Sequence, residues 1–431
     1  MLLRDALPHG GAAVHTGAGI STSSGVPDFR GPDGLWTRRA RGLSAPPASS
    51  PLSLARPTLS HMALYALVNS GHVHAVITAN VDGLHRRSGL PEHQLAELHG
   101  SCFKERCEHC NAFFNRDFEL ETVGFARTGR WCSECCYGAL VDQTLDWESE
   151  IPEHEIEKAE RWSINCPLSL VLGSSLRIRP ASELPVTAYA HGHSLTIVNL
   201  QKTPKDRKAS LVAHSRCDYI MARVTGYLGL EIPEYIRCDR LALMYSAMHE
   251  ASTSNLRLYV HAISSHGREC PIPWLHAVEL QENYEQSSGA KHDQLWTNEQ
   301  PDLLKSSILI SDKCERAESA YRSVQVRLQL NENLSEESVL VTNEIDLDRC
   351  MREECIYMHT MVTDRCCYKS EDPSEDAIAN AKHPANRDGR AKKTKAKRMR
   401  REDESEGWQP KSEAEVDSAL HYRCEAFMLS F

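Results

Sequence analysis

Short apolar runs recur through the first half of the chain, and each ends in a cluster of small or polar residues. The runs at 12–16 (AAVHT), 73–78 (VHAVIT), 168–172 (LSLVL) and 195–198 (LTIV) have the length and composition of strands buried on both faces. Segments with helical spacing separate them. This alternation predicts an α/β fold, a doubly wound parallel sheet with its ligand site along the edge where the strands end.

A helix is predicted from about residue 57, with Ser60 as its N-cap and an apolar face that includes Met62 and Leu64. The residues before it, 32–58, are rich in Pro, Ser, Ala and Arg and predict a loop. A long loop near the end of a strand is typical of segments that move over a ligand.

The stretch 14–31 (VHTGAGISTSSGVPDFRG) follows the first predicted strand and contains Gly17, Ala18 and Gly19 in succession. Glycines directly after a strand let the backbone approach a pyrophosphate, and the N-terminus of the next helix complements its charge. The dinucleotide-binding fingerprint has a third glycine where Thr22 stands here. By itself, the stretch therefore fits an ordinary tight turn equally well.

The second half of the chain has strand-like alternation at 256–263, 306–310, 322–330 and 338–342, strongest in VQVRLQL. The segment 265–304 lacks this alternation and is predicted to be irregular. These patterns indicate a small β-rich accessory unit.

The changes in pattern divide the chain into three parts. We expect a ligand-binding domain at 1–233, a β-rich accessory region at 234–370 and a disordered, charged tail at 371–431. Within the tail, 390–401 (RAKKTKAKRMRR) has eight Lys and Arg residues, although the whole chain has a net charge of −10. Such a run is typical of a nuclear localisation signal or a nucleic-acid contact, and a solvated tail is the alternative.

The composition, 41% hydrophobic and 25% charged, is that of a soluble chain. No apolar run approaches the length of a membrane span, so we expect no membrane partner. The first eleven residues lack the apolar region and cleavage site of a signal peptide. Sixteen cysteines in such a chain indicate reduced thiols, some of them metal ligands, and not a disulfide framework.

Two C-x-x-C pairs, separated by 21 residues, have spacing close to that of zinc ribbons. The pairs are Cys107 with Cys110 and Cys132 with Cys135. One such pair can arise by chance among sixteen cysteines, but two at this separation rarely do. We expect one structural Zn²⁺ in a module at about 100–140, with no open coordination position for chemistry. Cys136, beside the last of the four, is an alternative fourth ligand.

Several motifs occur in a fixed order between residues 12 and 233. They are GAGISTSSGVPDFRGPDGLW (17–36), TANVDGLHRRSGLP (78–91), ELHG (97–100), the two C-x-x-C pairs, LGSSLRIRP (172–180) and IVNLQ (197–201). In this order they resemble the sirtuin family, the NAD-dependent protein-lysine deacylases, and in detail its chromatin-associated class IV branch, which includes sirtuins six and seven. The resemblance implies a Rossmann-like sheet with the zinc module inserted into it.

The resemblance also implies that NAD⁺ is the cosubstrate and lies across the strand ends. The implied cofactor-binding residues are Gly17, Ala18, Gly19, Ile20, Asp28, Phe29, Arg30, Trp36, Asn80, Asp82, Gly173, Ser174, Ser175, Asn199, Leu200, Gln201 and Cys217. Among them, Asp82 and the Ile20 backbone would hold the carboxamide of nicotinamide, and Phe29 would shield the sugar once nicotinamide has left. Asn199 and Gln201 would contact the adenosine half.

His99 is the general base that the resemblance implies, and Asn80 the residue at the nicotinamide-side ribose. An acyl-lysine oxygen attacks C1′ of that ribose, nicotinamide departs, and an imidazole can then activate a ribose hydroxyl. Asp146 and Trp147 would form a wall of the acyl-peptide groove. Without the surrounding motifs, His99 is one of 21 histidines and fits a packed or capping role better.

The implied function is deacylation of lysine in proteins, with histone tails and nucleosomes as partners and a nuclear location. Protein mono-ADP-ribosyl transfer uses the same NAD activation and is one alternative. A weakly active chromatin scaffold that binds NAD or acyl-lysine is another. Ala79 stands where the family has glutamine, and the lost hydrogen bond at the NAD ribose is expected to weaken cofactor use by about 0.5–1.5 kcal/mol. Ser215 and Arg216 replace the glycine-led form of the adenine loop.

Overall fold

The structure is a computed structural model. It describes residues 2–45, 51–146, 149–250, 253–262, 272–282, 307–315, 321–350 and 355–368. Within these ranges, no helix is long and apolar enough to cross a bilayer. The basic run 390–401 and Trp147 lie outside them, so the predictions made for both stay predictions.

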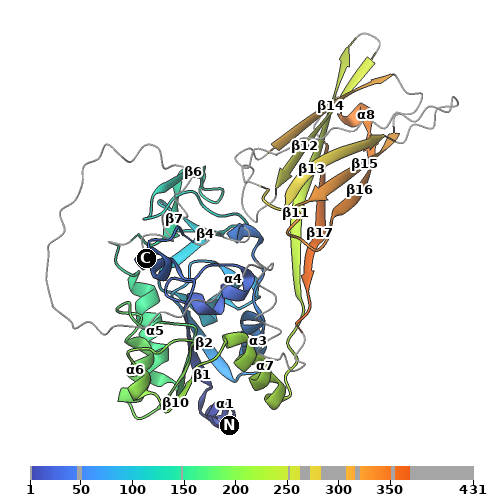
Figure 1. Cartoon of the computed structure of the whole chain (residues 1–431). Helices are drawn as coiled ribbons and strands as arrows, with labels where there is room; N and C mark the ends of the chain where they lie inside the picture. The colour runs from blue at the N-terminus through green and yellow to red at the C-terminus, as the bar shows by residue number, and fades with distance from the viewer. Residues whose placement is uncertain are drawn as a thin grey trace.

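A parallel sheet of six strands forms the centre of the first half of the chain (Figure 1). Its strands are β1 (Ala12–Thr16), β2 (Val73–Thr78), β3 (Leu95–Glu97), β8 (Leu168–Leu172), β9 (Ser194–Val198) and β10 (Leu211–Ala213), in the order β3-β2-β1-β8-β9-β10. Every residue of β1 is buried, which accounts for its continuous apolar run. The predicted doubly wound α/β sheet is confirmed, and its strand order reverses between β1 and β8, where open sheets of this kind bind ligands.

Helices cover both faces of the parallel sheet (Figure 1). The longer ones are α3 (Leu59–Asn69) and α7 (Cys217–Leu228) on one face, and α5 (Glu153–Asn165) and α6 (Leu184–Ala190) on the other. Short helices are α1 (Leu2–Ala6), α2 (Leu35–Ala40) and α4 (Leu84–Arg87). Single 3₁₀ turns are η1 (Leu7–His9), η2 (Ala18–Ile20), η3 (Thr22–Ser24), η4 (Leu52–Leu54), η5 (Glu92–Gln94) and η6 (Asp206–Lys208). The predicted loop 32–58 thus contains a helix and a 3₁₀ turn.

The N-cap of α3 differs from the prediction. Thr58, and not Ser60, has the extended backbone of a cap, and it forms a capping box with His61. The Ser60 hydroxyl instead donates to a carboxylate oxygen of Asp218 at 2.5 Å. The sequence pattern did not reveal this role of Ser60, because Asp218 lies 158 residues away in the sequence.

The second sheet is antiparallel and lies between β3 and α5 in the sequence. Its strands are β4 (Gly100–Cys107), β5 (Phe113–Asn115), β6 (Arg127–Trp131) and β7 (Ala139–Thr144), in the order β5-β4-β7-β6. The Glu105 carboxylate is fully buried here and accepts hydrogen bonds from Arg116 at 2.5 Å and Arg130 at 2.7 Å. Two guanidinium partners compensate a charge that would otherwise be costly to bury.

Two further antiparallel sheets face each other after α7. One has the order β14-β12-β11-β17 and the other β13-β15-β16. Their elements are β11 (Tyr235–Glu250), β12 (Thr253–Ala262), β13 (Leu275–Glu282), β14 (Ser307–Glu315), β15 (Tyr321–Leu330), β16 (Ser338–Asp346), α8 (Leu347–Cys350) and β17 (Cys355–Cys366). Leu243 and Val260 from the first sheet share one buried cluster with Val278 and Val326 from the second. We call this pair of packed sheets the β-sandwich.

Four strands of the β-sandwich, β12 and β14 to β16, overlap the predicted ones. The prediction that 265–304 is irregular is wrong at β13, where a break in register between Leu275 and Ala277 disturbs the alternation. Strand β11 was not predicted because charged residues, Arg237 and Asp239, occupy buried positions of its alternating pattern. The domain boundaries at 233 and 370 stay predictions.

Candidate active site

A cavity opens at the carboxyl ends of the parallel strands, where β1 and β8 lie side by side. Residues from five strand ends and from the start of α7 line it. The sequence-predicted residues among them are Gly17, Ala18, Gly19, Asp28, Phe29, Arg30, Asn80, Asp82, His99, Gly173, Ser174, Ser175, Asn199, Leu200, Gln201 and Cys217. Residues as far apart in the sequence as Gly17 and Cys217 therefore lie in one site. Their individual binding roles stay predictions.

Three of the predicted cofactor- and substrate-binding residues that the structure describes do not line this cavity. Ile20 is buried in the core, and its backbone N–H donates to the Gly17 carbonyl at 3.0 Å. Trp36 lies on α2, where its backbone N–H donates to the carbonyl of Phe29. Asp146 follows β7 and is separate from the cavity lining. The roles proposed for these three residues are untested.

The turn after β1 is in close contact with the turn after β8. The Gly19 N–H donates to the Gly173 carbonyl at 2.9 Å, and Gly173 has a φ of +63° that favours glycine. A Cβ on Gly19 would lie 2.7 Å from that carbonyl oxygen, and one on Gly17 would lie 2.9 Å from Ser174 Cα. Both glycines are required here by the proximity of another backbone.

A buried polar network joins β2 to the glycine turn. Asn80 Nδ2 donates to the Gly17 carbonyl at 3.2 Å and to Ser21 Oγ at 3.3 Å. Ser21 Oγ donates in turn to Asp82 Oδ2 at 2.6 Å, and the other oxygen of Asp82 accepts the N–H of Leu84. Each side chain is thereby held in one orientation. Ser21 is not among the residues predicted from the sequence, because it stands in a run of four hydroxyl residues that offers no reason to choose it.

His99 lies just beyond β3 and is almost completely buried. Its Nδ1 is 3.0 Å from the carbonyl oxygen of Ala79, an acceptor, so we assign the ring proton to Nδ1. Nε2 then carries the lone pair. Burial lowers the pKa of His99 below the ordinary value of 6.5, and the Ala79 carbonyl opposes this. At neutral pH the imidazole is therefore in the form that accepts a proton.

Asp218 is a second residue that the sequence analysis did not select. It lies in the first turn of α7 and lines the cavity. Oδ1 accepts the backbone N–H of Ser60 at 3.0 Å, and Oδ2 accepts the Ser23 hydroxyl at 2.5 Å. This carboxylate thus ties together α7, α3 and the glycine turn. Its position one residue after Cys217 was the only available signal.

Arg30 and Arg177 bring positive charge to the cavity. Burial lowers the pKa of Arg30, and the neighbouring Arg177 lowers it further. Two guanidinium groups close enough to repel each other indicate a site that favours an anion.

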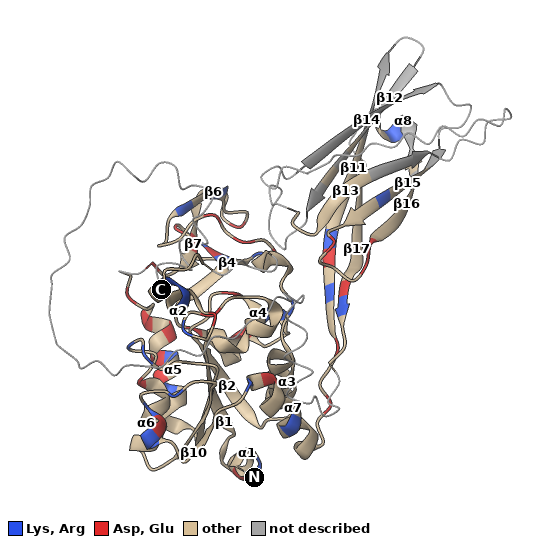
Figure 2. Cartoon of the chain, viewed as in Figure 1, with Lys and Arg blue, Asp and Glu red and all other residues tan. Residues whose placement is uncertain are grey.

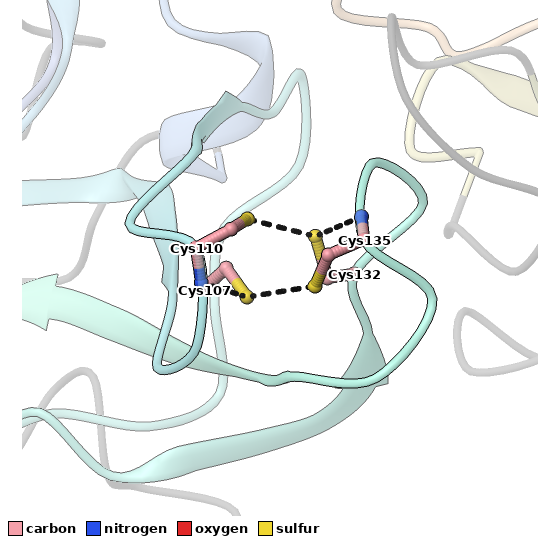
Figure 3. A group of neighbouring side chains, drawn as sticks. All are labelled: Cys107, Cys110, Cys132 and Cys135. Atoms are coloured by element: carbon pink, nitrogen blue, oxygen red, sulfur yellow. Dashed lines mark hydrogen bonds between the residues drawn. The ribbon is translucent and has the colours of Figure 1, made fainter.

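The four predicted zinc ligands converge at one end of the antiparallel module (Figure 3). All four Sγ atoms lie within 4.8 Å of one another, and the pairs Cys107–Cys135 and Cys110–Cys132 are each 3.6 Å apart. Tetrahedral zinc with Zn–S bonds of about 2.3 Å would space its sulfurs about 3.8 Å apart. The donor set and its spacing therefore fit Zn²⁺, which would close the module and leave no position for substrate.

Cys136, the alternative fourth ligand, lies outside this group. Its backbone has a φ of +60°, its side chain is exposed, and its Sγ is directed toward the Ser133 carbonyl. The left-handed backbone at this position ends the knuckle and turns the side chain away. The geometry favours Cys135 as the fourth ligand.

The family model of the Sir2 family matches residues 17–49 and 48–180. The NAD-dependent protein deacetylase SRT1 of Oryza sativa subsp. indica is 47% identical over 268 residues, which cover 62% of this chain and 55% of that protein. The NAD-dependent protein deacetylase Sirt6 of Drosophila melanogaster is 42% identical over 234 residues, covering 52% of this chain and 74% of that protein. The chain belongs to the Sir2 family.

Human NAD-dependent protein deacetylase sirtuin-7 is also similar, with 39% identity over 251 residues that cover 52% of this chain and 58% of that protein. The sirtuin resemblance is therefore confirmed, including its likeness to sirtuins six and seven. The chain spans about half the length of the rice and human relatives. The β-sandwich begins at Tyr235, after the last residue that the Sir2 model matches.

The glycine contact in this Sir2-family site generates a prediction. Gly19→Ala should lower the free energy of unfolding by about 1–3 kcal/mol, because the added methyl overlaps the Gly173 backbone. Gly226→Ala is the matched control. It lies in α7 with nothing within 4 Å of an added Cβ, and should stabilise by about 0.5–1 kcal/mol. Thermal unfolding of both variants measures this, and equal midpoints would contradict the account.

Zinc content provides a second prediction. Cys132→Ser should lose the single bound zinc and unfold at a lower temperature, because three thiolates hold the ion less tightly than four. Cys136→Ser should keep one zinc per chain, as measured by elemental analysis of the purified protein. Loss of zinc from Cys136→Ser with retention in Cys132→Ser would reverse the ligand assignment.

Proposed function

We propose that this Sir2-family chain is an NAD-dependent protein-lysine deacylase, which releases nicotinamide and transfers the acyl group to ADP-ribose. The observation that carries the proposal is the position of His99. Its imidazole lines the same cavity as the glycine turn, Asn80 and Asp82, and burial keeps it neutral. Its rice and fruit-fly relatives, which are named NAD-dependent protein deacetylases, support the same activity.

The cosubstrate would occupy the cavity along the strand ends. Ala18, Gly19 and the turn at Ser174 would take the pyrophosphate, where Arg30 adds positive charge. Asp82 would hold the nicotinamide carboxamide, together with the Ile20 backbone. The adenosine-binding residues would be Asn199, Leu200, Gln201 and Cys217.

The reaction would proceed by attack of the acyl-lysine oxygen on C1′ of the ribose, with departure of nicotinamide. Asn80, whose amide is oriented by Gly17 and Ser21, would position this ribose. The attack joins the acyl-lysine oxygen to C1′ and gives an imidate. His99 Nε2 would then remove a proton from a ribose hydroxyl, and the resulting oxygen would attack the imidate carbon. Addition of water and release of the amine give free lysine and O-acyl-ADP-ribose.

The tautomer of His99 depends on the backbone at position 79 and not on its side chain. Ala79 stands where the family has glutamine, and its carbonyl still accepts from His99 Nδ1. Alanine at position 79 should therefore lower the affinity for the NAD ribose without altering the general base, His99. Deacylation remains possible with a lower affinity for NAD.

Substrates and location follow the class IV resemblance. We propose acylated lysines in proteins, histone tails and nucleosomes among them, as substrates, with Asp146 and Trp147 as a wall of the peptide groove. The basic run 390–401 would direct the chain to the nucleus or contact nucleic acid.

The central test is consumption of NAD with an acylated histone peptide, for the full chain and for His99→Ala. Loss of the general base should lower the rate of O-acyl-ADP-ribose formation by about 10²–10⁴-fold. His191→Ala, an exposed histidine after α6, is the control and should be unaffected. Equal product formation by wild type and His99→Ala would end the proposed mechanism.

The same assay separates the alternatives. Peptide-dependent O-acyl-ADP-ribose supports deacylation, whereas label transferred from NAD to protein supports mono-ADP-ribosylation. Binding of NAD and peptide without turnover supports a scaffold. The second and third results contradict the proposed function.

The pH profile gives an independent prediction. Because burial lowers the pKa of His99, the neutral base persists to more acidic pH than an exposed histidine would. The acid limb of kcat/KM should therefore have its midpoint below pH 6.5, the ordinary histidine value. An acid limb centred above pH 6.5 would show that His99 is not the titrating base.

A further inference from the structure

One segment of the Sir2 domain, residues 51–57, lies between the cavity and the β-sandwich. Leu52, in the 3₁₀ turn η4, lines the cavity. It also packs with Val26, another cavity residue, in a small cluster around Leu84. The segment is therefore part of the wall of the candidate cofactor site.

On its inner side, the segment is hydrogen-bonded to the Sir2 domain. Arg87 Nη1 donates to the Leu52 carbonyl at 2.5 Å and to the Ala55 carbonyl at 3.1 Å. The Ser24 hydroxyl, in the turn that follows the glycines, donates to the Arg56 carbonyl. The backbone of the segment is thus attached to the same turn that forms the cofactor site.

On its outer side, the segment contacts the β-sandwich. The Arg56 guanidinium donates to both oxygens of Asp364 on β17, at 2.6 and 2.8 Å. It also donates to the Asn333 carbonyl in the β15–β16 turn at 3.2 Å. The Asp364 side chain is only 1% exposed, and the Ser335 N–H is another of its donors. A bidentate ion pair with one buried partner fixes both the distance and the orientation of segment 51–57 relative to β17.

A second contact lies beside the first. Arg237 on β11 donates to the Ser53 carbonyl at 2.7 Å and is held by Asp239 at 2.8 Å. Thr363 on β17 donates to the same Asp239 carboxylate. Figure 2 shows Lys or Arg and Asp or Glu residues on β11 and β17, in the half of each strand nearer the parallel-sheet domain.

Apolar side chains also pack together where segment 51–57, the zinc module and the β-sandwich meet. Leu54, from the segment itself, and Phe118 and Leu120, from the zinc module, belong to the same buried cluster as Leu241 of the β-sandwich. Each of the four successive residues 53–56 therefore contacts the Sir2 domain, the β-sandwich or both. Leu52, the residue just before them, lines the cavity.

We propose that the β-sandwich positions segment 51–57 and thereby sets the affinity of the cavity for NAD, with Arg56, Asp364 and Arg237 as positioning residues. The proposal rests on the function proposed above only in naming NAD as the ligand. Its specific content is that a unit outside the Sir2 match acts on the cofactor site through the contacts made by segment 51–57, without touching the cofactor. The competing account is that the β-sandwich is merely attached and adds stability.

The test uses the full chain with Asp364→Asn, which keeps the side-chain size but removes the charge, and with Arg56→Ala. Each should raise KM for NAD by about five- to tenfold and leave kcat within about twofold, because the reacting groups are unchanged. Hydrogen exchange of peptides covering 51–57 should become faster in both. The matched control is Arg127→Ala, which breaks an exposed ion pair with Glu108 in the zinc module and should change neither quantity.

Two further results distinguish failure of this inference from failure of the proposed function. If both variants unfold at a lower temperature while KM and exchange at 51–57 match wild type, the β-sandwich is only a stabilising unit and the proposal is wrong. If the wild-type chain consumes no NAD, the proposed function fails, but NAD binding can still be measured by titration alongside exchange at 51–57. Unchanged NAD affinity in both variants, or no binding by the wild-type chain, overturns the inference. Weaker NAD binding together with faster exchange, with Arg127→Ala unchanged in both, supports it.

Discussion

The contact between the Gly17–Gly19 turn and Gly173 is the constraint on which the site depends. Strands β1 and β8 are neighbours at the point where the sheet order reverses, so the turns that follow them meet. With the Gly19 nitrogen 2.9 Å from the Gly173 carbonyl oxygen, there is no space for a side chain between them. The cavity edge is consequently built from backbone, and backbone can approach a phosphate more closely than any side chain allows.

The polar groups around this edge are oriented by one another. Asn80, Ser21 and Asp82 form a chain of hydrogen bonds, and a backbone carbonyl determines which nitrogen of His99 carries the proton. Groups held in this way need little reorganisation during a reaction, which is the main source of electrostatic catalysis in enclosed sites. Burial then serves His99 as well, since it keeps the imidazole neutral.

The zinc module and the β-sandwich are stabilised by different means. The module has few buried apolar residues around its knuckles, and four thiolates fit a metal ion that would hold them together. The β-sandwich has an apolar core between its two sheets. Both meet at segment 51–57, since Phe118 of the module and Leu241 of the sandwich pack in one cluster with Leu54.

Local patterns in the sequence were sufficient for four of the six parallel strands, the glycine turn and the grouping of four cysteines, because each follows from spacing over a few residues. The sequence did not reveal Ser21 or Asp218, whose hydrogen-bond partners are distant along the chain. Strand β11 was missed for a related reason: Arg237 is buried only because Asp239 and the Ser53 carbonyl compensate its charge. Compensation of buried polar groups is a property of the assembled fold, and so the tertiary structure alone decided it.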